Sequence, residues 1–439
     1  MRRSLTRLEQ YFEFARLGTS WRTEILAGST TFVTMAYIIF VNPSILRDAG
    51  MPVAATTMAT CLSAALGSIL MGALARYPIA MAPGMGLNAY FAYAVVKGMG
   101  VSWQTALGAV FLSGVLFLLL TLLGARQWIV AAIPHELYAA VSVGIGVFIA
   151  FIGLRNAGIV VTNPATAVAL GDLTAPGPLL ALSGLILVAG LLAWGVRAAM
   201  LIGIAATAAA AVATGAAEWR PAGFDAAALG ATVWQLDIGS ALSRGALEII
   251  LVFCFVDLFD NVGTLVAVSK KAGLLDANHR IPRVDRILLC DATATIAGSL
   301  AGTSTVVSYI ESAAGVAAGG RSGVTAIVTG LLFAASILAA PFIGAVPAAA
   351  TAPALIVVGS LMMSSVKEID WDDVSIAVPA FLTLIAIPLT FSIANGLALG
   401  FTAYAILSAV RRGPGSVGWP VYLMTALFIF RFIYLGRTH

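Results

Sequence analysis

Cysteine, histidine and charged residues are all scarce in this sequence. Its 439 residues include three cysteines and three histidines, and only 10% of them are charged. Cys61, Cys254 and Cys290 lie in separate apolar stretches, so we expect neither a disulfide framework nor a zinc site. We expect no other metal or cofactor. No basic run interleaved with aromatic residues occurs in the sequence, so we also expect no nucleic-acid partner.

Apolar sequence, by contrast, is abundant. Hydrophobic residues make up 60% of the chain, whereas a soluble domain has roughly a quarter of its residues charged. A soluble fold would have too little polar sequence to cover its surface, so the excess must face lipid. The composition therefore predicts an all-α polytopic membrane protein embedded in a lipid bilayer.

Seven apolar runs precede a polar stretch at 217–242, and about eight follow it. A membrane-spanning helix needs about 20 apolar residues, and the runs approach that length. Pro388, Asn395 and Gly396 interrupt the region 374–435, where the division into spans stays open. We predict about fourteen spans.

The basic residues predict the orientation. Segment 1–25 has no short apolar run followed by a cleavage site, so we do not expect a signal peptide. The positive-inside rule places this segment in the cytoplasm, together with the basic loop after the eighth span. We therefore expect a multi-pass protein of the cell (inner or plasma) membrane, with stretch 217–242 outside. The basic residues concerned are Arg2, Arg3, Arg7, Arg16, Arg22, Lys270, Lys271, Arg280, Arg283 and Arg286.

Seven spans on each side of a midpoint predict an inverted repeat, because an odd number of spans reverses the second copy. The correspondence is clearest in the third span of each half. Residues 79–97 read PIAMAPGMGLNAYFAYAVV, and residues 302–320 read GTSTVVSYIESAAGVAAGG. Interrupted, small-residue segments at matching positions of two halves indicate a transporter binding site.

The first of these segments contains Pro83 and Gly84, which favour a break in the helix. We predict extended backbone over about 80–86 and a half-helix over about 88–97. Asn88 would then begin the half-helix. It would either cap the helix or turn its amide toward a ligand.

The second segment has Thr303, Ser304 and Thr305 before Glu311. The hydroxyl groups would satisfy open backbone or meet a ligand. An ionisable residue within a span is by default a functional-site hypothesis. The alternative for Glu311 is a pair with Arg321, or a position near the aqueous edge.

The eighth span reads LVFCFVDLFDNVGTLVAV, and a helix would put Asp257 and Asp260 on neighbouring turns of one face. The stretch contains no lysine or arginine to neutralise them. One of the two acids could bind protons, or a ligand that offers N–H donors. The alternative is a hydrogen-bonded pair that bridges helices. Phe255 and Tyr37 could also line such a site, although packing explains each of them equally well.

Three motifs resemble those of the AzgA-like purine permeases, a branch of the nucleobase–cation symporters related to the uracil and xanthine/uric acid permeases. They are PGMGLNAYFAY, FVDLFDNVGTL and GTSTVVSYIESAAGVAAGGRSG. TTFVTMAYIIFVNP in the first span and APALIVVGSLMM in the twelfth are also similar to this family. The resemblance covers nearly the whole chain.

The resemblance implies a 7+7 inverted repeat with short strands in the broken spans 3 and 10. A core domain would comprise 26–124 (spans 1–4) and 243–343 (spans 8–11). A gate domain would comprise 125–242 (spans 5–7) and 344–439 (spans 12–14). The core would move in an elevator-like manner to import adenine, guanine or hypoxanthine with protons. Related transporters tend to form homodimers.

The family's functional positions fall on Asn88, on Asp257 and Asp260, and on Glu311. In the related branches an acid followed by two residues and glycine marks the ligand contact, which ranks Asp260 and Glu311 first here. Val306 and Val307 depart from the family, which often has more hydroxyl groups there. We expect proton coupling at Asp257, Asp260 or Glu311. The full set of expected substrate-binding residues is Asp260, Glu311, Asp257, Asn88, Thr303, Ser304, Phe255 and Tyr37.

Two alternatives remain open. One is a permease of the same architecture for xanthine, uracil or an anion, although a pocket of carboxylates suits anions poorly. The other is an intramembrane hydrolase that uses Asp257 and Asp260 as a carboxylate pair. Broken, repeated spans have no needed role in hydrolysis, so we expect a transporter and not an enzyme.

Overall fold

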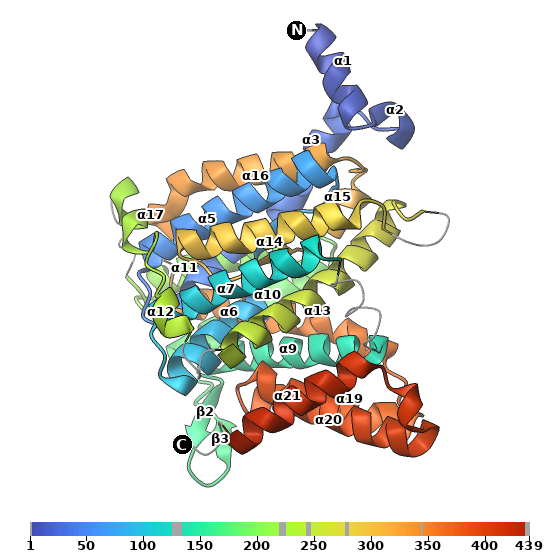
Figure 1. Cartoon of the computed structure of the whole chain (residues 1–439). Helices are drawn as coiled ribbons and strands as arrows, with labels where there is room; N and C mark the ends of the chain where they lie inside the picture. Colours follow the sequence, from blue (N-terminus) through green and yellow to red (C-terminus); the bar gives the residue numbers. More distant parts are fainter. Residues whose placement is uncertain are drawn as a thin grey trace.

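The computed structural model shows a bundle of long helices that lie side by side (Figure 1). Eight of the helices in the described ranges are long and apolar enough to cross a membrane, and shorter apolar helices accompany them. The expectation of a mainly helical membrane protein is confirmed, whereas the number of about fourteen spans stays a prediction. The described residues are 2–124, 134–218, 225–242, 247–276, 281–343 and 346–434.

The first half begins with two short helices, α1 and α2, that project from the bundle (Figure 1). Ser20 then starts the first long helix, because its hydroxyl accepts a hydrogen bond from the Thr23 N–H at 3.3 Å. The elements of this half are α1 Arg2–Tyr11, α2 Phe14–Leu17, α3 Trp21–Met35, α4 Ile38–Asp48, α5 Val53–Leu70, the π-helix η1 Met71–Ala75, β1 Met81–Pro83, α6 Met85–Ala89, the π-helix η2 Tyr90–Gly98, α7 Trp103–Leu122, α9 His135–Asn156, β2 Val160–Asn163, β3 Ala167–Leu170, α10 Pro176–Ala193 and α11 Ala199–Ala213.

The second half follows a polar connection that holds two short helices. α2 and α12 lie at opposite ends of the bundle (Figure 1). The elements are η3 Ala226–Ala231, α12 Ile238–Ala241, α13 Leu247–Ala272, α14 Val284–Ala301, β4 Val306–Ser308, α15 Ser312–Ala317, α16 Gly323–Ser336, η4 Ile337–Ala339, α17 Ala340–Ile343, α18 Ala348–Met362, η5 Met363–Glu368, α19 Val374–Leu389, α20 Ile393–Arg412, η6 Pro414–Ser416 and α21 Trp419–Tyr434.

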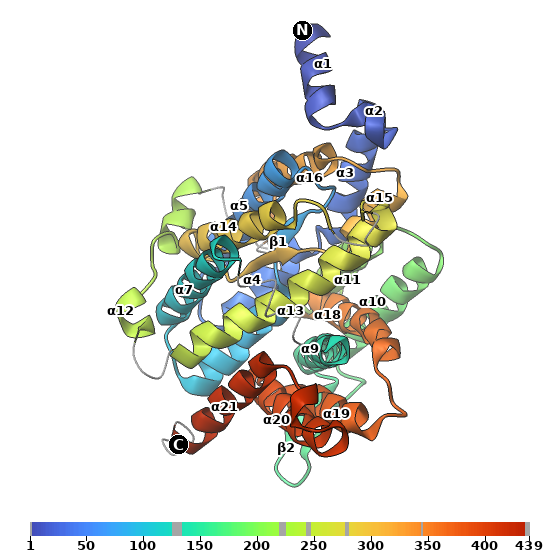
Figure 2. The same cartoon turned by 45° about the vertical axis from the view of Figure 1, so that its right-hand side comes forward.

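The two predicted strands are present, and they pair with each other. β1 and β4 form an antiparallel two-stranded sheet with Met81 opposite Ser308 and Pro83 opposite Val306. Figure 2 shows β1 in the interior of the molecule, and β1 and β4 contact α4, α5, α13 and α14. The broken segments of the two halves therefore meet inside the bundle.

The helices around this sheet pack in matching pairs. α5 packs on α16, and α14 packs on α7. Likewise α3 packs on α16, and α13 packs on α7. α16 therefore contacts two helices of the N-terminal half, and α7 contacts two helices of the C-terminal half. A second group forms around α9 and α18, which pack on each other and on α19 and α10, respectively.

Two parts of the fold differ from the expectations. β2 and β3 form a largely exposed hairpin that the hydropathy did not indicate. The region 374–435, where the number of spans was open, contains three apolar helices, α19, α20 and α21.

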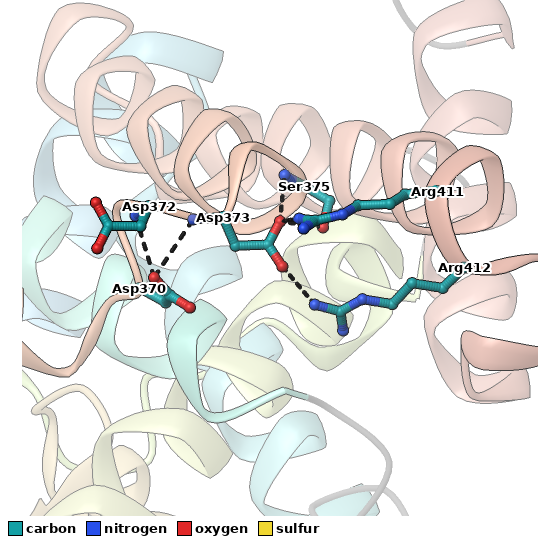
Figure 3. A network of polar contacts seen from close by, with 6 residues as sticks. All are labelled: Asp370, Asp372, Asp373, Ser375, Arg411 and Arg412. Carbon is teal, nitrogen blue, oxygen red and sulfur yellow. Dashed lines mark hydrogen bonds and ion pairs between the residues drawn. The ribbon is translucent and has the colours of Figure 1, made fainter.

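An ion-pair network joins two of these C-terminal helices (Figure 3). Asp373 caps α19 by accepting a hydrogen bond from the Ser375 N–H at 2.9 Å. The same carboxylate contacts both Arg411 and Arg412 at the end of α20. The carboxylate at the start of one helix thus holds the end of the next, which fixes them as an antiparallel pair.

Candidate functional site

The backbone groups that lack a helical hydrogen bond in each broken segment bond to the other broken segment. The Tyr309 N–H donates to the Ala80 carbonyl at 3.0 Å, and the Gly84 N–H donates to the Thr305 carbonyl at 3.0 Å. The Tyr309 hydroxyl also donates to the Pro83 carbonyl at 2.5 Å. Non-helical backbone at membrane depth is tolerated only where it is buried in protein or lines a cavity. These bonds meet that requirement.

One hydroxyl group on a neighbouring helix supports each strand. Ser68 of α5 accepts from the Met81 N–H at 2.9 Å and donates to the Met81 carbonyl at 3.1 Å. Thr295 of α14 makes the same two bonds to Val306, at 3.2 and 3.1 Å. Ser68 of α5 therefore supports β1 in the same way that Thr295 of α14 supports β4.

A buried network of neutral side chains joins four elements at the crossing. The Asn42 amide donates to the Thr60 and Thr303 hydroxyls at 2.8 and 2.9 Å. Its oxygen accepts from the Asn88 amide at 2.5 Å, and the Asn88 oxygen in turn accepts from the Ser304 hydroxyl. All five side chains are fully buried. The hydroxyls of Thr303 and Ser304 therefore help to hold the framework.

The structure does not support the capping alternative for Asn88. The half-helix begins at Met85, earlier than predicted, and Gly84 occupies its N-cap position. Asn88 lies one turn inside the helix, where its side chain bridges Asn42 and Ser304. The early start follows from the Gly84 N–H bond to the opposite segment, which fixes the helix entry.

Glu311 lies at the N-cap position of α15. The buried Tyr37 hydroxyl donates to its carboxylate at 2.5 Å. The predicted alternative of a pair with Arg321 is wrong, because the Arg321 guanidinium donates to the carbonyls of Val316 and Gly320. The structure thus brings together Tyr37 and Glu311, which lie 274 residues apart.

The two acids of the eighth span lie on α13, which is continuous as predicted. Asp257 is 2% exposed, and α13 packs against both β4 and α15. The side chain of Asp260 lies outside the part of the chain that the structure describes. Asn261, which the sequence analysis did not single out, is fully buried, and neither its amide oxygen nor its nitrogen has a hydrogen-bond partner among the described residues.

The aromatic contact between α13 and the third span comes from Phe253. Its ring lies 5.2 Å from that of Tyr90 in an edge-on arrangement and 6.5 Å from that of Phe91. Phe255, the predicted residue, is partly buried and packs against the main apolar core. A period-3.6 pattern does not distinguish these two positions when both faces of the helix are apolar.

The donor set of the site suits an organic ligand. Within the described ranges, no group of three or more histidine, cysteine or acidic residues converges as metal ligands would. The site instead offers the carboxylates of Glu311 and Asp257, which accept hydrogen bonds, beside a neutral amide network.

Comparison of the sequence with known proteins also indicates a permease. The chain is 52% identical over 430 residues to a permease of Methanocaldococcus jannaschii, covering 98% of this chain and 99% of that protein. It is 45% identical to the guanine/hypoxanthine permease PbuG of Bacillus subtilis (98% and 100% covered). It is 42% identical to the adenine permease AdeP of Escherichia coli K12 (98% and 96% covered).

The fold is similar to that of the transmembrane domain of the cyanobacterial bicarbonate transporter BicA. The TM-score is 0.63 at 13% identity, over 87% of this chain and 98% of that one. The resemblance to purine permeases predicted from the motifs is confirmed by the relatives. The model of the Permease family matches residues 22–399, and the chain, a multi-pass membrane protein, belongs to that family.

Proposed function

We propose that this protein imports purine nucleobases (adenine, guanine or hypoxanthine) by proton symport. The observation that carries the proposal is the Tyr37–Glu311 pair beside the crossing of two broken segments, in a chain whose relatives include adenine and guanine/hypoxanthine permeases. A purine ring is planar and presents N–H donors, which match carboxylate acceptors.

Glu311 and Asp260 are the proposed direct contacts to the base, with Asp257 beside them. Asn88, Thr303 and Ser304 would act mainly through the network that holds the crossing, and Tyr37 would orient Glu311. A buried carboxylate is costly to keep charged. One of the three acids would therefore take up the coupling proton. The base would then bind while the charge of that acid is neutralised.

Alternating access would follow an elevator mechanism. The proposed core comprises 26–124 and 243–343, and the gate 125–242 and 344–439. The paired packing of α5 with α16 and α14 with α7, and the matching roles of Ser68 and Thr295, support a 7+7 inverted repeat. The proposal includes a cytoplasmic N-terminus, the cell membrane as location and a homodimer.

Uptake of radiolabelled adenine, guanine and hypoxanthine into cells that express the protein tests the substrate class. We expect saturable uptake that a protonophore abolishes and that rises as the outside is acidified. An uptake rate that does not change with the proton gradient would exclude proton symport, although it would still show that the base is transported. Unlabelled xanthine and uracil serve as competitors. Stronger competition by either of them than by the three purines would favour the alternative permease.

A further inference from the structure

A cavity of about 730 Å³ lies between α3–α4, α11 and the η4–α17 segment. Its three walls include Phe32 of α3, Ala209 of α11 and Phe342 of α17. Ser336 provides the one polar side chain among the lining residues, and its hydroxyl donates to the Leu332 carbonyl of its own helix at 2.9 Å. The cavity therefore offers a ligand only hydrocarbon.

This lining selects the class of ligand. A bound water needs two to four polar partners, and a nucleobase needs partners for its N–H groups; these walls provide neither. Leu201 and Ala213 both line the cavity, so it follows α11 for about 18 Å at 1.5 Å per residue. An apolar cavity that extends this far along an apolar helix matches an extended hydrocarbon chain.

A positive charge lies near one end of the cavity, on Arg197, which is not itself a lining residue. Arg197 lies just before α11, one helical turn from Leu201, and donates to the Thr30 hydroxyl of α3 at 3.4 Å. Arg197 is exposed, and it has no ion-pair partner among the described residues. An arginine guanidinium matches the geometry of a phosphate group.

We infer that this cavity binds one acyl chain of a phospholipid whose phosphate group lies at Arg197. The site is separate from the Tyr37–Glu311 pair, since neither residue lines the cavity and Tyr37 is fully buried. Its walls come from α3–α4 and α17 on one side and α11 on the other. The lipid would therefore lie between the two proposed domains, although its binding does not depend on the transported substrate.

Filling the cavity tests this inference. Ala205 and Ala209 line it, and both are exposed, so the double variant Ala205→Phe/Ala209→Phe puts two rings into the space of the chain. Ala206→Phe is the matched control, because Ala206 is exposed on the same helix but does not line the cavity. The readout is native mass spectrometry of the full-length protein in detergent with added palmitoyl-oleoyl phosphatidylglycerol.

We expect the unchanged protein and Ala206→Phe to keep one phospholipid per chain after washing, and the double variant to lose it. Arg197→Ala should keep less lipid and lose the preference for phosphatidylglycerol over uncharged diacylglycerol. Equal retention by the double variant, or none by the unchanged protein, overturns the inference.

A photoreactive acyl chain gives an answer even if the double variant does not fold. In the unchanged protein we expect cross-links at α11 and α17 inside the cavity. Labelling confined to outward-facing positions such as Ala206 or Ile186 would mean surface lipid only, and would refute the site.

Discussion

Glu311 pairs with a phenol, and this distinguishes it from the arginine-paired carboxylates of many membrane proteins. The Tyr37 hydroxyl donates at 2.5 Å and is itself neutral, so the bond orients the carboxylate without cancelling its charge. In the proposed mechanism, the carboxylate then remains available for a proton or for an N–H group of the ligand. A guanidinium in the same place would occupy the carboxylate permanently.

Glu311→Gln should weaken base binding about 10- to 100-fold, since a hydrogen bond to a charged group contributes about 1.5–3 kcal/mol. Tyr37→Phe keeps the ring and should cost less, about tenfold. Uptake kinetics and competition by unlabelled base, normalised to the amount of protein in the membrane, measure both. Unchanged affinity in Glu311→Gln would remove Glu311 from the list of contacts.

Asn42→Ala should lower the stability of the folded protein by about 2–4 kcal/mol, because it removes three buried bonds and leaves partners unsatisfied. Thr60→Val should have a smaller effect in the same direction. Thr57→Val is the control, since the Thr57 hydroxyl is also buried but bonds only to the Val53 carbonyl of its own helix. Thermal unfolding in detergent compares the three, and equal midpoints for all would contradict a structural role for the network.

At the scale of elements, glycine sets how closely the central helices of the second group approach. A Cβ atom added to Gly359 of α18 would lie 2.3 Å from the carbonyl oxygen of Gly146 on α9. A Cβ at Gly146 would lie 2.8 Å from the carbonyl oxygen of Gly359. The backbones of α9 and α18 are thus in direct contact at these glycines. A backbone carbonyl cannot move away from an added methyl group as the end of a flexible side chain can.

Gly359→Ala should therefore separate α9 from α18 and lower both the thermal midpoint and the uptake. Gly190→Ala on α10 is a matched control, because its new methyl group would have no neighbour within 4 Å. Alanine also favours the helix over glycine by about 1 kcal/mol, so this control should be neutral or slightly stabilising. Loss of stability in the control alone would show that the contact at Gly359 is not the cause.

At the scale of the whole molecule, α1–α2 and α12 lie at opposite ends of the bundle. The native cysteines Cys61, Cys254 and Cys290 are all buried, so single exposed cysteines can be labelled against a low background. We expect a membrane-impermeant maleimide to label Asp225→Cys in intact cells and Gln10→Cys only after permeabilisation. The reverse pattern would invert the proposed orientation.

The sequence predicted the broken segments and their acids because glycine, proline and carboxylates are conspicuous within apolar runs. It did not predict which groups bond to which: Tyr309 with Pro83, or Tyr37 with Glu311, are contacts over more than 200 residues. The contact of Phe253 with Tyr90 is another that the sequence does not indicate, whereas the ligand contact expected for Phe255 stays a prediction. Local pattern indicates burial, whereas the partner depends on the packed helices.

Glu24 is the clearest residue that the sequence analysis missed. It was assigned to the cytoplasmic N-terminal segment, yet it is fully buried in α3. Its carboxylate accepts from the backbone N–H groups of Arg321, Ser322 and Thr325 at the start of α16. A charged residue at the border of an apolar run is usually expected to be exposed to solvent. Only the position of the N-terminus of α16 shows that Glu24 is buried and caps that helix.

The pairing of β1 with β4 also has a consequence for how the protein is made. The Tyr309 hydroxyl bonds to the Pro83 carbonyl across 226 residues. At ~5–20 residues per second, the first broken segment waits roughly 11–45 s for its partner to leave the ribosome. During that time its open backbone must be sheltered by water or by an insertion factor. The site therefore cannot assemble before Tyr309 has been synthesised, although Pro83 precedes it by 226 residues.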